Sequence, residues 1–284
     1  MKSLLAARPL SAFIGAHSPL SARLAAEAGF DGIWASGFEL SALHGVPDAS
    51  IVTQTQHLET ASAMAFAVPV PVLADVDTGF GNAVNLWHAT RDYEAAGCRG
   101  LVVEDKTFPK DTSLLPGGRQ ELVRIEEFQG KIAAAVDARR DPDFAIIART
   151  EALIAGAGLE EALVRARAYV AAGADAILIH SKQKTPDEVL AFIAAWDLPA
   201  PLVLVPTAYP QLDEAAIRAL GKVRLVIYGN HGLRAAVQAM TDCFRAIRAA
   251  GGAAGVENAI APLERIFTLQ GVSAMKDLER KFLR

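Results

Sequence analysis

Short apolar, β-branched runs alternate with alanine-rich stretches of helical period along the whole chain. The runs predict eight strands, at 12–16, 32–36, 70–77, 100–105, 144–149, 176–181, 202–207 and 224–229. The stretches between them predict helices, among them 19–28, 83–96, 123–138, 159–171, 186–195, 214–220 and 233–249. Nearly continuous apolar strands between helices indicate a parallel sheet that is buried on both faces. Eight strand–helix units favour an α/β fold of the (β/α)8 TIM-barrel type over an open doubly wound sheet, which usually has about five or six strands.

The end of the chain exceeds what one barrel needs. A barrel of this type takes about 250 residues, and the chain has 284. Beyond the glycine pair at 251–252, two further helical patterns cover 259–269 and 275–283. We therefore expect a single barrel domain over 1–284, in which 253–284 form terminal helices that pack on a neighbouring subunit of a homo-oligomer.

Composition and charge exclude several classes of protein. The 28 basic and 32 acidic residues give a net charge of −4, which argues against binding to nucleic acid or an anionic membrane. A hydrophobic content of 52% supports a large core and excludes disorder. Two cysteines are too few for a disulfide framework or a thiolate metal cage. Arg8 and Pro9 interrupt the only stretch that resembles a secretory signal, so we expect a cytoplasmic protein.

Carboxylates stand at the ends of two neighbouring predicted strands, where a barrel places its active site. Asp75 and Asp77 flank one residue of the third strand, so strand alternation predicts that both project to the same side. Glu104 ends the fourth strand. Close carboxylates in an apolar barrel repel each other, and a hard cation such as magnesium or manganese removes that penalty. In the alternative interpretation, one aspartate caps a helix and the other pairs with a lysine or arginine.

A long polar loop follows the fourth strand, over 106–120. It exceeds the usual two to six residues of a βα connection, and long polar loops on a barrel are commonly active-site lids. Lys110, Asp111, Thr112 and Ser113 favour a lid that delivers polar groups to the substrate. The alternative is a surface excursion with solvated charges. We refer to residues 106–120 as the lid.

Arginine and histidine end the next two strands. Arg149 needs an anion if it points into the mouth of a barrel, and its planar fork suits phosphate or carboxylate. Glu151 is the alternative partner. His180 is either an anion contact or a hydrogen-bonded core residue, and Trp34 is expected to wall the pocket. The glycine-rich run 78–82 is expected to be a tight turn instead of a phosphate loop, because its spacing fits no nucleotide fingerprint.

These motifs together resemble the phosphoenolpyruvate mutase/isocitrate lyase superfamily. The segments that carry the resemblance are 32–38, 75–82, 104–114, 119–128, 179–181 and 205–207. The resemblance implies a magnesium-type site, with manganese or cobalt as alternatives, in which Asp75 binds the metal directly. Asp48, Asp77 and Glu104 are implied to act mainly through bound water. It further implies a tetramer, a dimer of dimers that exchanges terminal helices.

The resemblance also implies roles in substrate binding. Ser36, Gly37 and Phe38 are implied to hold a substrate carboxylate, partly through backbone N–H groups. Arg149 and His180 are similar to residues that grip a phosphonate.

The lid distinguishes branches of the superfamily. Members that break carbon–carbon bonds usually carry a lid cysteine, and this lid has none. The mutase branch has an asparagine where this chain has Thr112, and threonine there resembles the branch that hydrolyses 3-phosphonopyruvate to pyruvate and phosphate. We expect that reaction to proceed through a pyruvate enolate, with Arg149, His180 and Lys110 offsetting charge on the phosphoryl oxygens. Ser113 is expected to bind the substrate, and Thr112 to orient the attacking water or to attack itself. The alternatives are a phosphomutase, a lyase or decarboxylase of 2-oxo or 2-hydroxy dicarboxylates, and a non-enzymatic scaffold that would tolerate Asp75→Ala.

Overall fold

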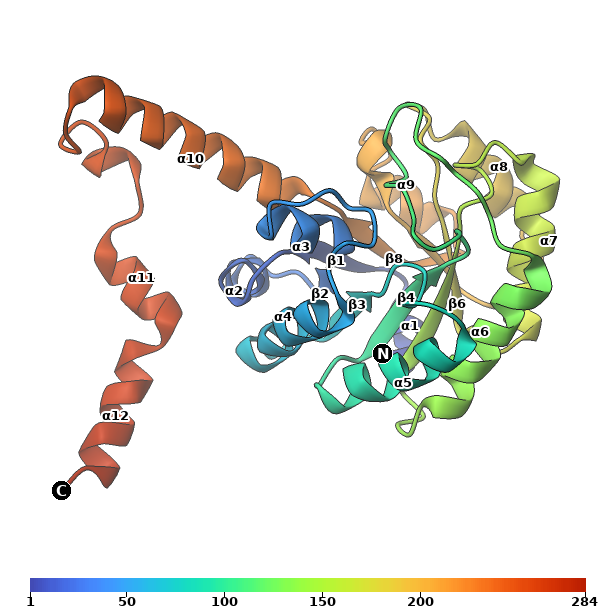
Figure 1. The fold of residues 1–284 in the computed structure, drawn as a ribbon, viewed down its shortest axis with the longest axis horizontal. Coiled ribbons are helices and arrows are strands. Elements are labelled where there is room, and N and C mark those ends of the chain that lie inside the picture. The colour runs from blue at the N-terminus through green and yellow to red at the C-terminus, as the bar shows by residue number, and fades with distance from the viewer. The chain divides into compact units, whose positions relative to one another are not determined.

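The eight predicted apolar runs all form strands, which close into a parallel barrel in chain order (Figure 1). The computed structural model describes residues 1–284. Its strands are β1 (Ser11–Ala16), β2 (Gly32–Ala35), β3 (Val72–Asp75), β4 (Gly100–Glu104), β5 (Ala145–Thr150), β6 (Ala176–Ile179), β7 (Leu202–Leu204) and β8 (Val223–Tyr228). Leu225 of β8 pairs with Ser11 of β1, so the sheet has no free edge. The predicted TIM-type barrel is therefore confirmed.

Helices connect the strands within a first compact unit, Met1–His231. They are α1 (Lys2–Ala7), α2 (Pro19–Glu27), α3 (Gly37–Leu43), α4 (Gln54–Ala67), α5 (Ala83–Ala95), α6 (Ile125–Ala138), α7 (Gly158–Ala171), α8 (Asp187–Ala195), η1 (Pro206–Ala208) and α9 (Glu214–Ala219). α1, α3 and α4 lie outside the predicted ranges. None of the helices combines the length and apolarity that crossing a bilayer requires.

Several strands end earlier than their apolar patterns predict. β3 ends at Asp75 instead of 77, β6 at Ile179 instead of 181, and β7 at Leu204 instead of 207. Asp77 has a φ of 50°, which a strand does not adopt. The prediction that strand alternation sets Asp77 beside Asp75 is therefore wrong, because Asp77 already belongs to the turn into α5.

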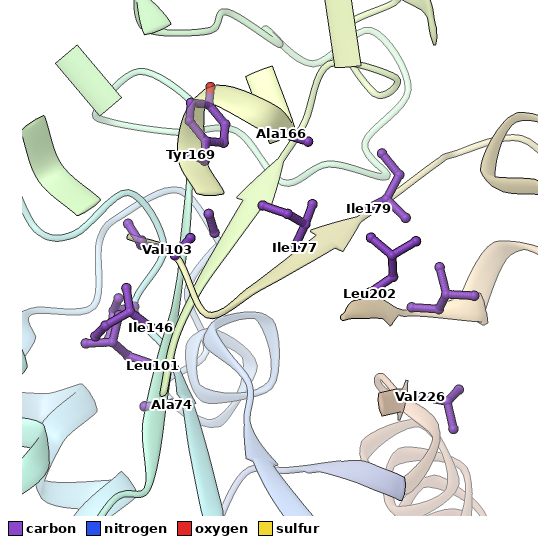
Figure 2. Packing of buried hydrophobic residues seen from close by; sticks show 14 of the residues in the cluster. Ala74, Leu101, Val103, Ile146, Ala166, Tyr169, Ile177, Ile179, Leu202 and Val226 are labelled. Atoms are coloured by element: carbon purple, nitrogen blue, oxygen red, sulfur yellow. The ribbon is translucent and has the colours of Figure 1, made fainter. Parts of the chain in front are cut away.

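The core has two layers because successive strand residues point to opposite faces. Val102 and Ile147 lie in the barrel interior cluster, together with Leu178 of β6. Their chain neighbours pack in a larger cluster against the surrounding helices. Figure 2 shows part of this outer layer, with Leu101 on a strand and Tyr169 on α7. The rigid inner barrel fixes the rim from which the polar strand ends project.

A second compact unit covers Gly232–Arg284. It contains α10 (His231–Ala250) beyond its first residue, η2 (Glu257–Ala259), α11 (Leu263–Gln270) and α12 (Val272–Phe282). Gly271 joins the last two helices with a φ of 74°, a left-handed conformation that favours glycine. Met275, Leu278 and Phe282 of α12 are 46, 57 and 64% exposed. The spacing of these residues gives α12 an apolar face that nothing in this unit covers.

Candidate active site

A cavity of about 360 Å³ lies at the carboxyl ends of the strands. Ten of the predicted site residues line it: Trp34, Ser36, Phe38, Asp48, Asp75, Lys110, Thr112, Ser113, Arg149 and His180. The other three, Gly37, Asp77 and Glu104, do not form its wall, but each contacts a residue that does. The barrel thus brings the predicted set together at one rim.

The first carboxylate group of the site is held by backbone amides. Asp75 ends β3, and its Oδ2 accepts the N–H of Gly37 at 3.2 Å, while its Oδ1 accepts the N–H of Asp77 at 3.3 Å. A Cβ at Gly37 would lie 2.6 Å from Oδ1 of Asp77, so only glycine allows this close approach. The N–H of Gly37 is therefore engaged by Asp75 instead of pointing free toward a substrate carboxylate. Burial raises the pKa of Asp75, and it raises that of Asp77 to about 8.

Lys110 reaches from the lid to two aspartates. Its Nζ lies 2.6 Å from Oδ1 of Asp77 and 3.1 Å from Oδ1 of Asp48, with a hydrogen bond of 3.2 Å to Oδ2 of Asp48. The close contact with Asp77 is electrostatic, because Oδ1 meets no hydrogen-bond geometry. Burial disfavours the ammonium charge, but the neighbouring carboxylates hold the pKa of Lys110 well above its usual range. The predicted lid lysine thus sits among the carboxylates that the resemblance assigns to the metal.

Glu104 ends β4 and is left without a hydrogen bond. It is 1% exposed, and neither carboxylate oxygen has a hydrogen-bond partner. The nearest cations are Lys106 Nζ at 3.8 Å and Arg149 Nε at 3.4 Å. A buried carboxylate with unsatisfied oxygens is costly unless a cation or ordered water reaches it.

The charges around the cavity fit a divalent cation. Fully ionised, the buried cluster would carry two negative charges in excess, which burial disfavours, as the raised pKa values of Asp75 and Asp77 show. Its five carboxylates and three cations are Asp48, Asp75, Asp77, Glu104 and Glu151 against Lys106, Lys110 and Arg149. No three His, Cys, Asp or Glu side chains are arranged to bind one ion directly. Magnesium keeps several of its waters and needs only one or two direct carboxylates, so this oxygen-rich, loosely spaced set suits it.

Glu151 is the centre of an ion-pair network around Arg149. It is fully buried and pairs with Nε of Arg149, while Ser113 Oγ donates to it at 2.5 Å. Arg149 Nη2 also donates to Ser113 Oγ at 2.9 Å. Burial would raise the pKa of Glu151, but the charge of Arg149 holds it well below its ordinary value. The predicted alternative, in which Glu151 partners Arg149, is therefore correct, and Arg149 still lines the cavity.

The lid, green in Figure 1, forms one wall of the cavity. Its base is closed by an antiparallel bridge between Lys106 and Leu122. Leu114, Leu115 and Pro116 form its tip and line the cavity with apolar side chains. These three residues do not stand out as candidates in the sequence, because apolar residues in a polar loop carry no chemical signal.

The glycine-rich run 78–82 is the expected tight turn. Gly79 and Gly81 have φ values of 90° and 148°, and Asn82 caps α5 by accepting the N–H groups of Val84 and Asn85. Lys131 of α6 donates to the carbonyl oxygen of Thr78 at 2.9 Å and anchors the turn from behind. The turn therefore positions Asp77 instead of cradling a phosphate.

Thr207 and Asn230 also line the cavity, beside Val205 and Gly229. They follow β7 and β8, and no specific role for them is predicted from the sequence. The only signal that locates them is their position after a barrel strand.

Comparison with known proteins places this geometry among enzymes. A family model described as phosphoenolpyruvate phosphomutase matches residues 1–248. A phosphonopyruvate hydrolase from Variovorax sp. (strain Pal2) is 60% identical over 271 residues, which cover 95% of this chain and 93% of that protein. A crystal structure of phosphonopyruvate hydrolase in complex with oxalate and Mg²⁺ superposes with a TM-score of 0.95 at 56% identity, covering 100% of this chain and 98% of that one. A phosphoenolpyruvate phosphomutase from Streptomyces platensis subsp. rosaceus superposes with a TM-score of 0.97 at 52% identity, with the same coverage.

Proposed function

The chain belongs to the phosphoenolpyruvate phosphomutase family, and we propose that it hydrolyses the carbon–phosphorus bond of 3-phosphonopyruvate to give pyruvate and phosphate. The observation that carries the proposal is one cavity lined both by buried carboxylates and by the Arg149–His180 pair. The substrate has a 2-oxo acid end and a phosphonate end. One side of the cavity suits a cation-bound 2-oxo acid, and the other suits the phosphonate oxygens.

The phosphonate is held by Arg149 and His180 in this proposal. Arg149 is a permanent cation with a planar fork that matches phosphonate oxygens. Its Nε is engaged by Glu151 and its Nη2 by Ser113 and His180, so the guanidinium is fixed before substrate arrives. Fixed donors stabilise charge that develops on the phosphoryl oxygens without reorganising first.

Breaking the carbon–phosphorus bond leaves its electron pair on the pyruvyl carbon, and the adjacent ketone takes the pair as an enolate. Asp75, with Asp48, Asp77 and Glu104 through water, would hold Mg²⁺ near that ketone. When bound, the ion supplies Lewis-acid stabilisation of the oxygen charge. The enolate then takes a proton to become pyruvate, and water adds its oxygen to phosphorus. Thr112, at the cavity wall, orients this water or attacks phosphorus itself.

The decisive experiment combines the protein with 3-phosphonopyruvate and Mg²⁺. Release of inorganic phosphate and pyruvate in equal amounts, abolished by EDTA, supports the hydrolase. If phosphorus NMR shows phosphoenolpyruvate as the product, the protein is a mutase and not a hydrolase. The mutase is the second candidate because the chain is similar to the Streptomyces phosphomutase. Faster turnover of oxaloacetate or a 2-hydroxy dicarboxylate would favour a decarboxylase or lyase. That outcome is disfavoured because the two cysteines, Cys98 and Cys243, lie outside the lid.

We also propose that the protein is a homo-oligomer, a dimer of dimers, in which residues 253–284 pack on a neighbouring subunit. The support is the apolar face of α12, where Met275, Leu278 and Phe282 recur at helical spacing. Exposed apolar faces of this kind usually mark interaction surfaces. Light scattering coupled to gel filtration tests the mass, and a monomer would contradict the proposal.

A further inference from the structure

The ammonium group of Lys106 lies inside the lid and not in the cavity. Lys106 is 1% exposed, and its Nζ donates to the carbonyl oxygen of Asp111 at 2.6 Å, to Ser113 Oγ at 2.9 Å and to Gln120 Oε1 at 3.0 Å. An ammonium has only three N–H donors. All of them are therefore used, and every acceptor belongs to the lid.

Gln120 holds Thr112, the residue between Asp111 and Ser113. Its Nε2 donates to the carbonyl oxygen of Thr112 at 3.1 Å. Because Lys106 holds Oε1, the amide is fixed in the orientation that points Nε2 at Thr112. Lys106 and Gln120 together thus grip three consecutive residues, 111–113, from within the lid.

We propose that Lys106 and Gln120 are positioning residues that hold Thr112 at the wall of the cavity, an inference that rests on the proposed hydrolase function. Neither residue lines the cavity, whereas Thr112 and Ser113 do. Fixing the carbonyl groups on both sides of the Thr112 Cα limits the positions that its hydroxyl can take relative to the phosphoryl group. Misplacement of a reacting group by about 1 Å can reduce a rate about 10²-fold.

Lys106 also neutralises nearby carboxylates, so a variant that removes its charge would change more than the lid. Its Nζ lies 3.8 Å from Glu104 and 3.6 Å from Glu151, both buried. Deleting the lysine would leave these carboxylates with less positive charge and threaten folding. The test therefore rests on Gln120, and Lys106→Arg serves as a second variant that keeps the charge but changes the geometry of the donors.

The main variant is Gln120→Glu. A glutamate still offers an oxygen to Lys106 but has no N–H for the carbonyl of Thr112. The matched control is Glu121→Gln, the reverse substitution one residue further along, on an exposed side chain that makes no hydrogen bond or ion pair. Hydrogen exchange of a peptide covering 107–122 is measured in the ligand-free protein. We expect exchange roughly three- to tenfold faster in Gln120→Glu and unchanged in Glu121→Gln. Equal exchange in wild type and Gln120→Glu would overturn the inference.

Steady-state kinetics distinguish the positioning of Thr112 from a general effect on folding, because only positioning should lower kcat with little change in KM. For phosphate release from 3-phosphonopyruvate, we expect Gln120→Glu to lower kcat about 10- to 100-fold. KM should change less than about threefold, because Arg149 and His180 are untouched. Lys106→Arg should also lower kcat. An unchanged kcat in Gln120→Glu would overturn the proposal even if exchange accelerates. If wild-type protein releases no phosphate, the hydrolase proposal fails, while the exchange comparison still decides whether Gln120 holds the lid.

Discussion

Nη2 of Arg149 lies 2.9 Å from Nδ1 of His180, and a guanidinium can only be the donor in that contact. Nδ1 therefore carries no proton, and the neutral ring bears its hydrogen on Nε2. Oε1 of Glu151 lies farther from Nδ1, at 3.3 Å, and would favour the opposite tautomer. The shorter contact and the permanent charge of arginine decide the assignment. Burial and Arg149 accordingly lower the pKa of His180.

A neutral His180 is expected to bind the phosphonate as a hydrogen-bond donor and not to act as a general acid. Because its pKa is lowered, the ring becomes charged only below the ordinary value of 6.5. Nitrogen-15 NMR of histidine-labelled protein should show Nδ1 without a proton at pH 7. His180→Ala should lower kcat/KM about 10²-fold, the effect of losing one fixed donor. A proton on Nδ1 at pH 7 would contradict the assignment.

His57 should make the protein less stable in acid. It is buried on α4, Nδ1 bonds to Tyr93 OH at 2.8 Å, and Nε2 has no partner. Burial lowers its pKa from 6.5 to about 4, so the unfolded chain binds the extra proton first. Stability from this group is complete above pH 6.5 and is lost as pH falls to 4, by about 3 kcal/mol in all. Urea unfolding of wild type and His57→Gln at pH 7 and pH 4.5 measures the difference. Equal pH dependence in the two proteins would refute it.

Thr112→Ala should abolish phosphate release with little effect on folding. The side chain lines the cavity from the lid and contributes nothing to the buried core. Thr112→Ser keeps a hydroxyl and should retain a measurable rate. The comparison uses turnover assays beside thermal melting of both variants. Wild-type turnover in Thr112→Ala would move the role elsewhere in the lid.

Mg²⁺ should stabilise the wild-type protein against heat. A ligand at a hundred times its Kd adds about 2.7 kcal/mol to the free energy of unfolding. Asp75→Asn should lose both that gain and activity, since it removes one charge while keeping an acceptor for Gly37. Asp197→Asn is the control, because Asp197 is exposed and pairs only with Arg167. A magnesium-dependent shift that survives in Asp75→Asn would place the ion elsewhere.

The apolar face of α12 should control assembly. Leu278→Lys and Phe282→Lys place charges on exposed apolar positions, 57 and 64% exposed in this chain. If that face packs on a neighbouring subunit, burial of a charge there weakens association. Light scattering should show smaller particles for each variant, with the circular dichroism of wild type. Lys276→Gln, on the same helix, should leave the mass unchanged.

The barrel and its rim follow from local patterns. Asp75 and Glu104 end β3 and β4, Arg149 is the last residue but one of β5, and parallel strands present their carboxyl ends at a common edge. Glu104 even pairs in register with Arg149. Sequence spacing is sufficient for such residues, because the strand itself carries each one to the site.

Contacts that depend on the path of a loop are not predictable in this way. Asp48 and Lys110 are 62 residues apart and meet only because the lid folds back over the barrel, so the sequence indicates Asp48 through family resemblance alone. Lys106 and Gln120 stand in the predicted lid, but their shared contacts with 111–113 depend on how that loop folds back on itself. Asp77 shows the converse error, since a turn instead of strand alternation brings it to the cluster.

The tip of the lid, residues 114–116, should tolerate substitutions that residues 111–113 do not. The apolar side chains of Leu114, Leu115 and Pro116 line the cavity. Residues 111–113, by contrast, are held by hydrogen bonds from Lys106 and Gln120. Directed evolution toward bulkier phosphonates would therefore begin at 114–116, where a smaller side chain enlarges the cavity without disturbing Thr112. Libraries at 111–113 would return mostly inactive clones. Within the six residues 111–116, the first three are held in place by hydrogen bonds, and the last three can be changed to alter the shape of the cavity.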